Sequence, residues 1–112
     1  MNEKVDIRDF VKLDLRVGEI KEVRDHENAS KLFVLKVDLG EKEERTIVAG
    51  LKGHYEKEDL IGKKAVFIAN LQPINLRGIE SNGMILAASD KSKENVRILI
   101  IDGDFEVGSK VS

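Results

Sequence analysis

The segment from Asn70 to Ser89 holds the side chains of this chain that are best suited to contact a charged, hydrogen-bonding ligand. Arg77 precedes Gly78 in a stretch without helical periodicity, so no helix neighbour is expected to neutralise its guanidinium, which suits phosphates and stacked bases. Ser81 adds a hydroxyl that could contact a phosphate or a ribose 2′-hydroxyl, and Met84 adds a soft group that could pack on a base. Structural alternatives stay open for both, because a loop serine can cap a turn and a methionine can plug the end of a β-barrel.

Hydrophobic alternation around this segment predicts mostly β-structure. Apolar residues at alternate positions or in short runs predict strands at residues 13–17, 33–39, 45–49, 64–71, 84–88 and 96–101. The alternation breaks at Gly18 and Glu19, which predicts a β-bulge there. The residues between 71 and 84 are expected to form a loop, and residues 105–111 are expected to run back along the body.

Two short helices are predicted beside these strands. Apolar residues follow helical spacing after Asp6, a good capping residue, so residues 6–12 are expected to form a helix that packs on one end of the barrel. A second helical segment falls within residues 50–62 and is closed by Gly62. Three strands, a helix and two further strands are the order of a five-stranded OB-fold barrel, here with a short N-terminal helix and a C-terminal strand extension.

Length and composition fit one domain. The chain has 112 residues, of which 41% are hydrophobic and 36% are charged, and it can bury a real core. We expect an N-terminal helical segment over residues 1–12, the barrel over residues 13–89 and the extension over residues 90–112. The absence of cysteine, of a signal-peptide core and of an apolar run of about 20 residues predicts a cytoplasmic chain without disulfides or a membrane span.

The sequence contains no constellation typical of an enzyme, a cofactor or a metal. The two histidines, His26 and His54, have no cysteine partner, and surface or loop packing is the simpler interpretation of both. Phosphate-binding glycine motifs are absent, and Ser81 has no adjacent base that would make it a nucleophile. We therefore expect a non-catalytic protein that binds neither cofactor nor metal.

The distribution of charge is more informative than its sum. A net charge of −2 argues against a protein that binds nucleic acid over its whole surface. Residues 45–79 nevertheless carry six basic and three acidic side chains, which predicts a local phosphate-facing patch unless these charges only solvate outer strand faces. Four of the five aromatic residues fall at core positions by periodicity, so base stacking is expected to matter less than RNA backbone shape.

An ordered series of short motifs runs through nearly the whole chain. It resembles the tRNA-binding domain of the methionyl-tRNA synthetase C-terminus and its free-standing relatives. Its members are residues 10–20, 26–32, 45–51, 54–55, 60–64, 70–89 and 108–111. The chain departs from the usual family pattern at Glu27, Ser30 and Asn75, which concerns individual contacts more than the family.

The resemblance implies structure-specific tRNA binding, as a synthetase β subunit or C-terminal domain that aids aminoacylation without catalysing it. It places the central loop between the last two barrel strands, and it implies that Arg16 and Lys36 lie near each other on paired strands. The expected tRNA-binding face consists of Arg16, Lys31, Lys36, Lys64, Asn70, Arg77, Ser81 and Met84.

The resemblance also implies partners. Besides tRNA, these are a second copy of the chain and a methionyl-tRNA synthetase catalytic subunit. Residues 96–101 support a homodimer independently, because they are apolar on both faces and a closed barrel can cover only one; the tail at Phe105, Val107 and Val111 could cover the other in a monomer. The rival function is that of a protein-interaction or chaperone-like OB-fold module.

Overall fold

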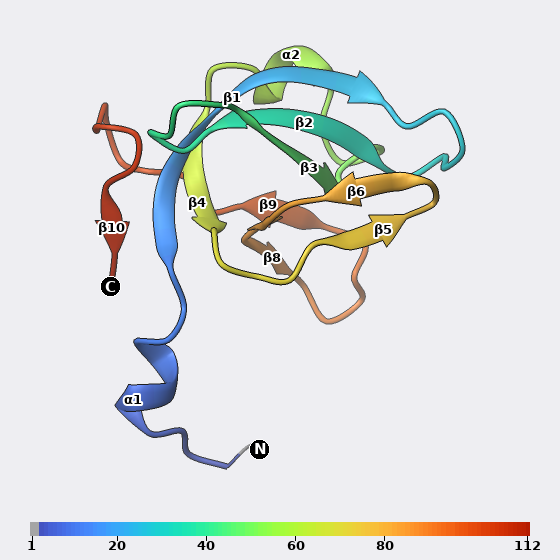
Figure 1. Ribbon diagram of the computed structural model, residues 1–112. Coiled ribbons are helices and arrows are strands. Elements are labelled where there is room, and N and C mark those ends of the chain that lie inside the picture. The colour runs from blue at the N-terminus through green and yellow to red at the C-terminus, as the bar shows by residue number, and fades with distance from the viewer. Residues whose placement is uncertain (1–2) are drawn as a thin grey trace.

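The computed structural model describes residues 3–112, so Met1 and Asn2 of the predicted N-terminal segment lie outside the described residues. Five strands form a nearly closed barrel in the order β3-β2-β1-β4-β7, which confirms the predicted OB-fold (Figure 1). These strands are β1 (Leu15–Asp25), β2 (Phe33–Asp38), β3 (Arg45–Ala49), β4 (Lys64–Ile68) and β7 (Met84–Ile85).

Strand β1 is the longest strand and curves around the barrel. Its first half pairs with β4, where Glu19 lies opposite Lys64, and its second half pairs with β2. The predicted bulge at Gly18 and Glu19 is wrong, because the register shifts later, between Ile20 and Glu22. Gly18 serves close packing instead: a Cβ there would lie 2.6 Å from Leu39 Cδ2.

The central loop and the C-terminal part contain more β-structure than predicted. Residues 71–83 include a hairpin of β5 (Ile74–Leu76) and β6 (Ile79–Ser81). The predicted strand 84–88 is interrupted at Leu86, because β7 pairs with β4 whereas β8 (Ala87–Ser89) pairs with β9 (Val96–Ile98). The tail returns as expected, since β10 (Lys110–Val111) pairs with the start of β1.

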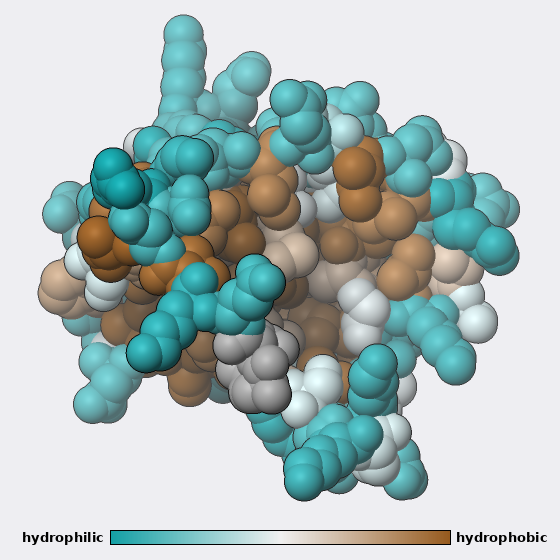
Figure 2. Space-filling model, turned by 90° about the horizontal axis from the view of Figure 1, so that it is seen from below, coloured by the Kyte–Doolittle hydropathy of each residue, from teal (hydrophilic) through white to brown (hydrophobic). Residues whose placement is uncertain are grey.

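The N-terminal helix α1 (Ile7–Phe10) is shorter than predicted and does not pack on the barrel. Asp6 caps it as expected, because its carboxylate accepts a hydrogen bond from the Arg8 N–H at 2.8 Å. The apolar side chains of the helical segment stay exposed, with Val11 at 63%, and the helix projects from the barrel (Figure 1). The face from which the N-terminus projects carries uncovered apolar surface (Figure 2).

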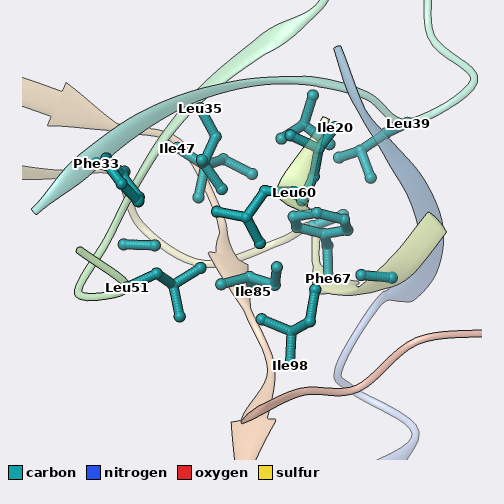
Figure 3. Packing of buried hydrophobic residues seen from close by; sticks show 14 residues of the cluster. Ile20, Phe33, Leu35, Leu39, Ile47, Leu51, Leu60, Phe67, Ile85 and Ile98 are labelled. Atoms are coloured by element: carbon teal, nitrogen blue, oxygen red, sulfur yellow. The ribbon is translucent and has the colours of Figure 1, made fainter. Parts of the chain in front are cut away.

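The main core fills the barrel and is closed at one end by α2 (Lys57–Leu60). Leu60 is fully buried and points into the same interior as Phe67 of β4 and Ile20 of β1 (Figure 3). Gly62 ends this helix with a φ of +89°, a left-handed conformation that glycine adopts without strain. A second apolar cluster, outside the main core, consists of Leu15, Val66 and Ile68 with partly buried Leu13, Leu86, Ile101 and Val111.

Candidate nucleic-acid interface

Arg77 lies at the tip of the β5–β6 hairpin. Arg77 and Gly78 form its two-residue turn, and both have positive φ angles, 57° and 100°. Two successive residues with positive φ are typical of a type I′ turn, whose twist matches that of the flanking strands. The Gly78 N–H is held by Asn75 Oδ1 at 2.9 Å. Sequence reasoning missed this hairpin. The alternation of apolar and polar residues on either side of the Arg77-Gly78 pair could have indicated it.

The hairpin tip rests on the loop between β1 and β2. The His26 ring bridges the two, with Nε2 2.8 Å from the Leu76 carbonyl oxygen and Nδ1 3.0 Å from the Asn28 N–H. Arg77 Nε donates to the Asn28 carbonyl at 3.2 Å. These two loops lie at the same end of the molecule (Figure 1), and in OB-folds they are the loops that bind oligonucleotides.

Ser81 lies where the central loop meets strand β3 and the barrel closes, a contact that we call the seam. Its hydroxyl accepts a hydrogen bond from the Val48 N–H at 2.9 Å and donates to the Gly83 carbonyl at 3.2 Å. The next residue continues the seam, because the Asn82 N–H donates to the Thr46 carbonyl. Ser81 is 3% exposed, so its hydroxyl holds the central loop against strand β3 and is turned away from any ligand.

Replacing Ser81 by alanine should destabilise the fold. The change leaves the Val48 N–H buried without its acceptor, which costs about 1–3 kcal/mol. Chemical denaturation of Ser81→Ala measures the loss, and Ser89→Ala, at an exposed strand position, is the matched control with an effect within about ±0.5 kcal/mol. An equal effect of the two variants would contradict the assignment of Ser81 to the seam.

Two further predicted residues lie beside the seam, and a third lies in the β1–β2 loop. Lys36 Nζ donates to Thr46 Oγ1 at 2.8 Å, beside the seam that Thr46 forms with the central loop. Met84 follows the seam in β7 and is 43% exposed, so it does not plug the barrel. Lys31 is exposed in the β1–β2 loop that supports Arg77. Their contact with nucleic acid stays a prediction.

The expected closeness of Arg16 and Lys36 is wrong. Lys36 lies opposite Glu22, six residues beyond Arg16 along β1, which corresponds to about 20 Å of strand. Arg16 instead pairs with Asp14 at 2.9 Å and lies 3.9 Å from Glu41, so acidic groups accompany its charge. Arg16 lies opposite the buried Phe67 in the β1–β4 pairing, so it is on the inward face of β1, whereas Lys36 is on the outer face of β2.

This partly buried network should make the fold sensitive to acid. The hydrogen bonds from Arg16 to Asp14 and from Arg45 to Glu41 hold the pKa of each carboxyl below its ordinary value. A lowered folded-state pKa stabilises the fold above the unfolded pKa, and that stability is lost as pH falls through the folded pKa. We expect the free energy of unfolding to fall below about pH 4, and Glu41→Gln to reduce this fall more than Glu43→Gln, an exposed control on the same turn.

Asn70 and Lys64 lie apart from the hairpin tip. Asn70 clamps the N-terminal segment, because its Oδ1 accepts from the Asp14 N–H at 2.8 Å and its Nδ2 donates to the Lys12 carbonyl at 2.7 Å. Lys64 Nζ contacts Asp104 at 2.6 Å, at the end of β4 opposite to the one that pairs with Met84, about 13 Å along the strand. Both side chains therefore serve internal contacts.

Ion pairs in the folded protein neutralise much of the positive charge excess of residues 45–79. Four of its six basic side chains form ion pairs with acids from outside the segment, and these pairs are Arg45 with Glu41, Lys52 and Lys57 with Asp25, and Lys64 with Asp104. Arg77 is not among these four. The remaining two are Lys63, which lies beside Lys64, and Arg77, so the charge excess of the central loop narrows to Arg77 at the hairpin tip.

The described part of the chain, residues 3–112, contains no cluster of three histidine or acidic side chains that could hold a metal ion. Its helices are too short to cross a membrane. His26 packs between two loops as interpreted from the sequence, and His54 lies at a half-buried position before α2.

Comparison with known proteins decides the family. Residues 15–110 match the family described as "Putative tRNA binding domain". The chain belongs to the tRNA-binding domain family. The domain is 56% identical over 109 residues to a methionine–tRNA ligase of Pyrococcus horikoshii, a match that covers 97% of this chain and 15% of the ligase.

Two solved structures share the fold of this tRNA-binding domain over their whole length. A methionyl-tRNA synthetase-related protein from Pyrococcus horikoshii superimposes with a TM-score of 0.91 at 35% identity, covering 99% of this chain and 100% of that chain. The chaperone CsaA from Bacillus anthracis superimposes with a TM-score of 0.88 at 26% identity, covering 98% of this chain and 100% of that chain.

Proposed function

We propose that this domain binds tRNA through the end of the barrel where the β5–β6 hairpin meets the β1–β2 loop. Membership of the tRNA-binding domain family is the observation that carries the proposal. The exposed Arg77 at the hairpin tip, with Lys31 in the adjoining loop, supports this location. A guanidinium can bind phosphate in a bidentate manner, which suits recognition of the RNA backbone.

We assign the predicted site residues two kinds of role. Arg77, Lys31, Lys36 and Met84 form the proposed contact surface. The other four are assigned structural roles, since their polar groups are engaged within the protein and all but Ser81 lie away from the hairpin; these are Arg16, Lys64, Asn70 and Ser81.

A gel-shift experiment with bulk tRNA at two salt concentrations tests the proposal. Binding should weaken as salt rises, because each phosphate contact releases counterions. A DNA duplex of equal length is the control and should bind more weakly, since the proposed surface recognises folded RNA. Equal binding of tRNA and duplex would overturn the proposal.

We further propose that the domain aids aminoacylation by methionyl-tRNA synthetase without catalysing it, either as a β subunit or as a C-terminal domain. The similarity to methionine–tRNA ligases supports this role, although the chain spans only 15% of the length of the matched ligase. Adding the chain to a methionyl-tRNA synthetase that lacks its C-terminal domain should lower the KM for tRNA. An unchanged KM, with tRNA binding intact, would contradict the role in trans.

We also propose that two copies pair through apolar surface outside the barrel. Leu99 is 41% exposed, Ile100 is 56% exposed and Phe105 is 56% exposed, so the tail does not cover this apolar surface. Large exposed apolar patches in proteins usually mark interfaces. Light scattering at micromolar concentration should give close to twice the 12.5 kDa of one chain, and Ile100→Asp should shift the mass toward one chain. A single-chain mass for the unmodified protein would contradict pairing.

Chaperone-like binding of other proteins is the second candidate function, favoured by the full-length similarity to CsaA. The same exposed apolar side chains could serve it. Suppression of the aggregation of an unfolded test protein, undiminished by saturating tRNA, would support this candidate over tRNA binding.

A further inference from the structure

The His26 side chain is buried although it belongs to a surface loop. It is 4% exposed, and among the described residues only His26 and Ser81 are buried polar side chains. Both ring nitrogens are used within the protein, one by Asn28 in the same loop and the other by Leu76, 50 residues along the chain from His26. A buried polar group whose hydrogen bonds are all made stabilises one arrangement of its surroundings, because other arrangements leave it without hydrogen-bond partners.

The two contacts determine the tautomer of the ring. The Asn28 N–H can only donate, so Nδ1 is the acceptor and carries no proton. The Leu76 carbonyl can only accept, so Nε2 carries the proton and donates it. His26 is therefore neutral in this arrangement and contributes no charge toward an RNA ligand.

The hairpin needs such support. Its two strands have three residues each, and a short two-stranded hairpin is marginally stable in isolation. His26 binds the carbonyl of Leu76, the residue immediately before Arg77. The same loop also binds Arg77 itself, through the Asn28 carbonyl. The imidazole thus organises both the loop and the strand end that leads into the turn.

We infer that His26 is a positioning residue for tRNA recognition: it joins the β1–β2 loop to the β5–β6 hairpin and presets Arg77 for a phosphate. The inference rests on the proposed function, since it names how that surface is held. A hairpin tip released from its support must be ordered again when RNA binds, which lowers affinity although no positive charge is removed.

A pair of variants separates the two hydrogen bonds. A glutamine amide can reach the position of Nε2 and donate to the Leu76 carbonyl, whereas an asparagine amide reaches only the position of Nδ1. His26→Gln should retain tRNA affinity within about twofold, whereas His26→Asn should weaken it about fivefold. Equal affinities of the two variants would overturn the inference.

Two readouts distinguish positioning from general stabilisation. In the Arg77→Ala background, His26→Asn should weaken tRNA binding less than about twofold, because the guanidinium that His26 positions is already absent. Losses that multiply in the double variant would contradict the inference. Nitrogen NMR of the unmodified protein should show protonated Nε2 and unprotonated Nδ1, and the opposite tautomer would contradict it as well.

A measurement without RNA separates this inference from the proposed function. Amide hydrogen exchange over residues 74–81 should be faster in His26→Asn than in His26→Gln, with melting temperatures recorded for both. If the unmodified chain fails to bind tRNA, the proposed function fails, and the exchange rates still report whether His26 holds the hairpin. Unchanged exchange in His26→Asn overturns the inference even where tRNA binding is intact.

Discussion

Arg77→Asn should weaken tRNA binding about tenfold, equivalent to about 1.4 kcal/mol, while leaving the fold as stable as before or more stable. Arg77 is exposed at the hairpin tip, so its loss should remove a phosphate contact without opening a cavity. Its φ of 57° is a conformation that costs most residues about 1 kcal/mol, whereas asparagine tolerates it well. Titration of labelled tRNA measures the affinity, and thermal unfolding measures the stability.

Lys63→Asn is the matched control for this prediction. It removes the same charge from an exposed position beside Lys64. This position is immediately before the start of β4, whereas the seam is near the end of β4. We expect it to change tRNA affinity less than about twofold and to leave the salt dependence intact, whereas Arg77→Asn should reduce the salt slope by about one. Loss of folding in Arg77→Asn would show that Arg77 is structural. Equal losses of affinity in the two variants would show that the loss reflects net charge and not the position of Arg77.

Phe67→Ala should have the largest effect on stability, a loss of about 3–5 kcal/mol. Phe67 is fully buried in β4 and packs in the main core together with Ile20 and Leu60. Removing its ring loses burial and leaves a cavity that the surrounding barrel strands cannot close. Since small domains are stable by only about 5–15 kcal/mol, the variant should be partly unfolded at 37 °C, which urea denaturation and near-ultraviolet circular dichroism can detect.

Phe105→Ala tests the same chemical change at an exposed position. Phe105 is 56% exposed in the tail, so its truncation should change the stability of a single chain within about ±0.5 kcal/mol. A loss comparable with that of Phe67→Ala would indicate that Phe105 is buried in solution, as pairing of two chains would require. Comparison at low and high protein concentration separates the two cases.

Much of the barrel follows from local pattern. Alternating apolar residues predicted β2 and β3 to within one residue, and Asp6 and Gly62 predicted the start of one helix and the end of the other. The core assignment of the aromatic residues was less successful. Phe33 and Phe67 are buried, whereas Phe10 and Phe105 are exposed, because periodicity identifies an apolar face without showing whether another element covers it.

The sequence predicted which segment carries the candidate site, but it did not predict how the side chains of that segment are arranged in space. Composition indicated Arg77 as the main contact residue, but the hairpin that presents it was interpreted as a loop. Ser81 and Asn70 were predicted to meet RNA, yet both make hydrogen bonds within the protein to backbone groups distant in sequence. Residue type shows which hydrogen bonds a side chain can make, whereas its partner depends on which backbone groups the fold leaves unpaired nearby.

The sequence by itself determined the family, the strand order and the identity of the charged loop, because these depend on residue types, spacing and short-range periodicity. Only the tertiary structure decided which side chains face a ligand. His26 meets Leu76, and Arg16 lies near Glu41, through contacts that form when the curved β1 strand brings separate segments together. Such contacts involve partners that are up to 50 residues apart, and no local pattern records them.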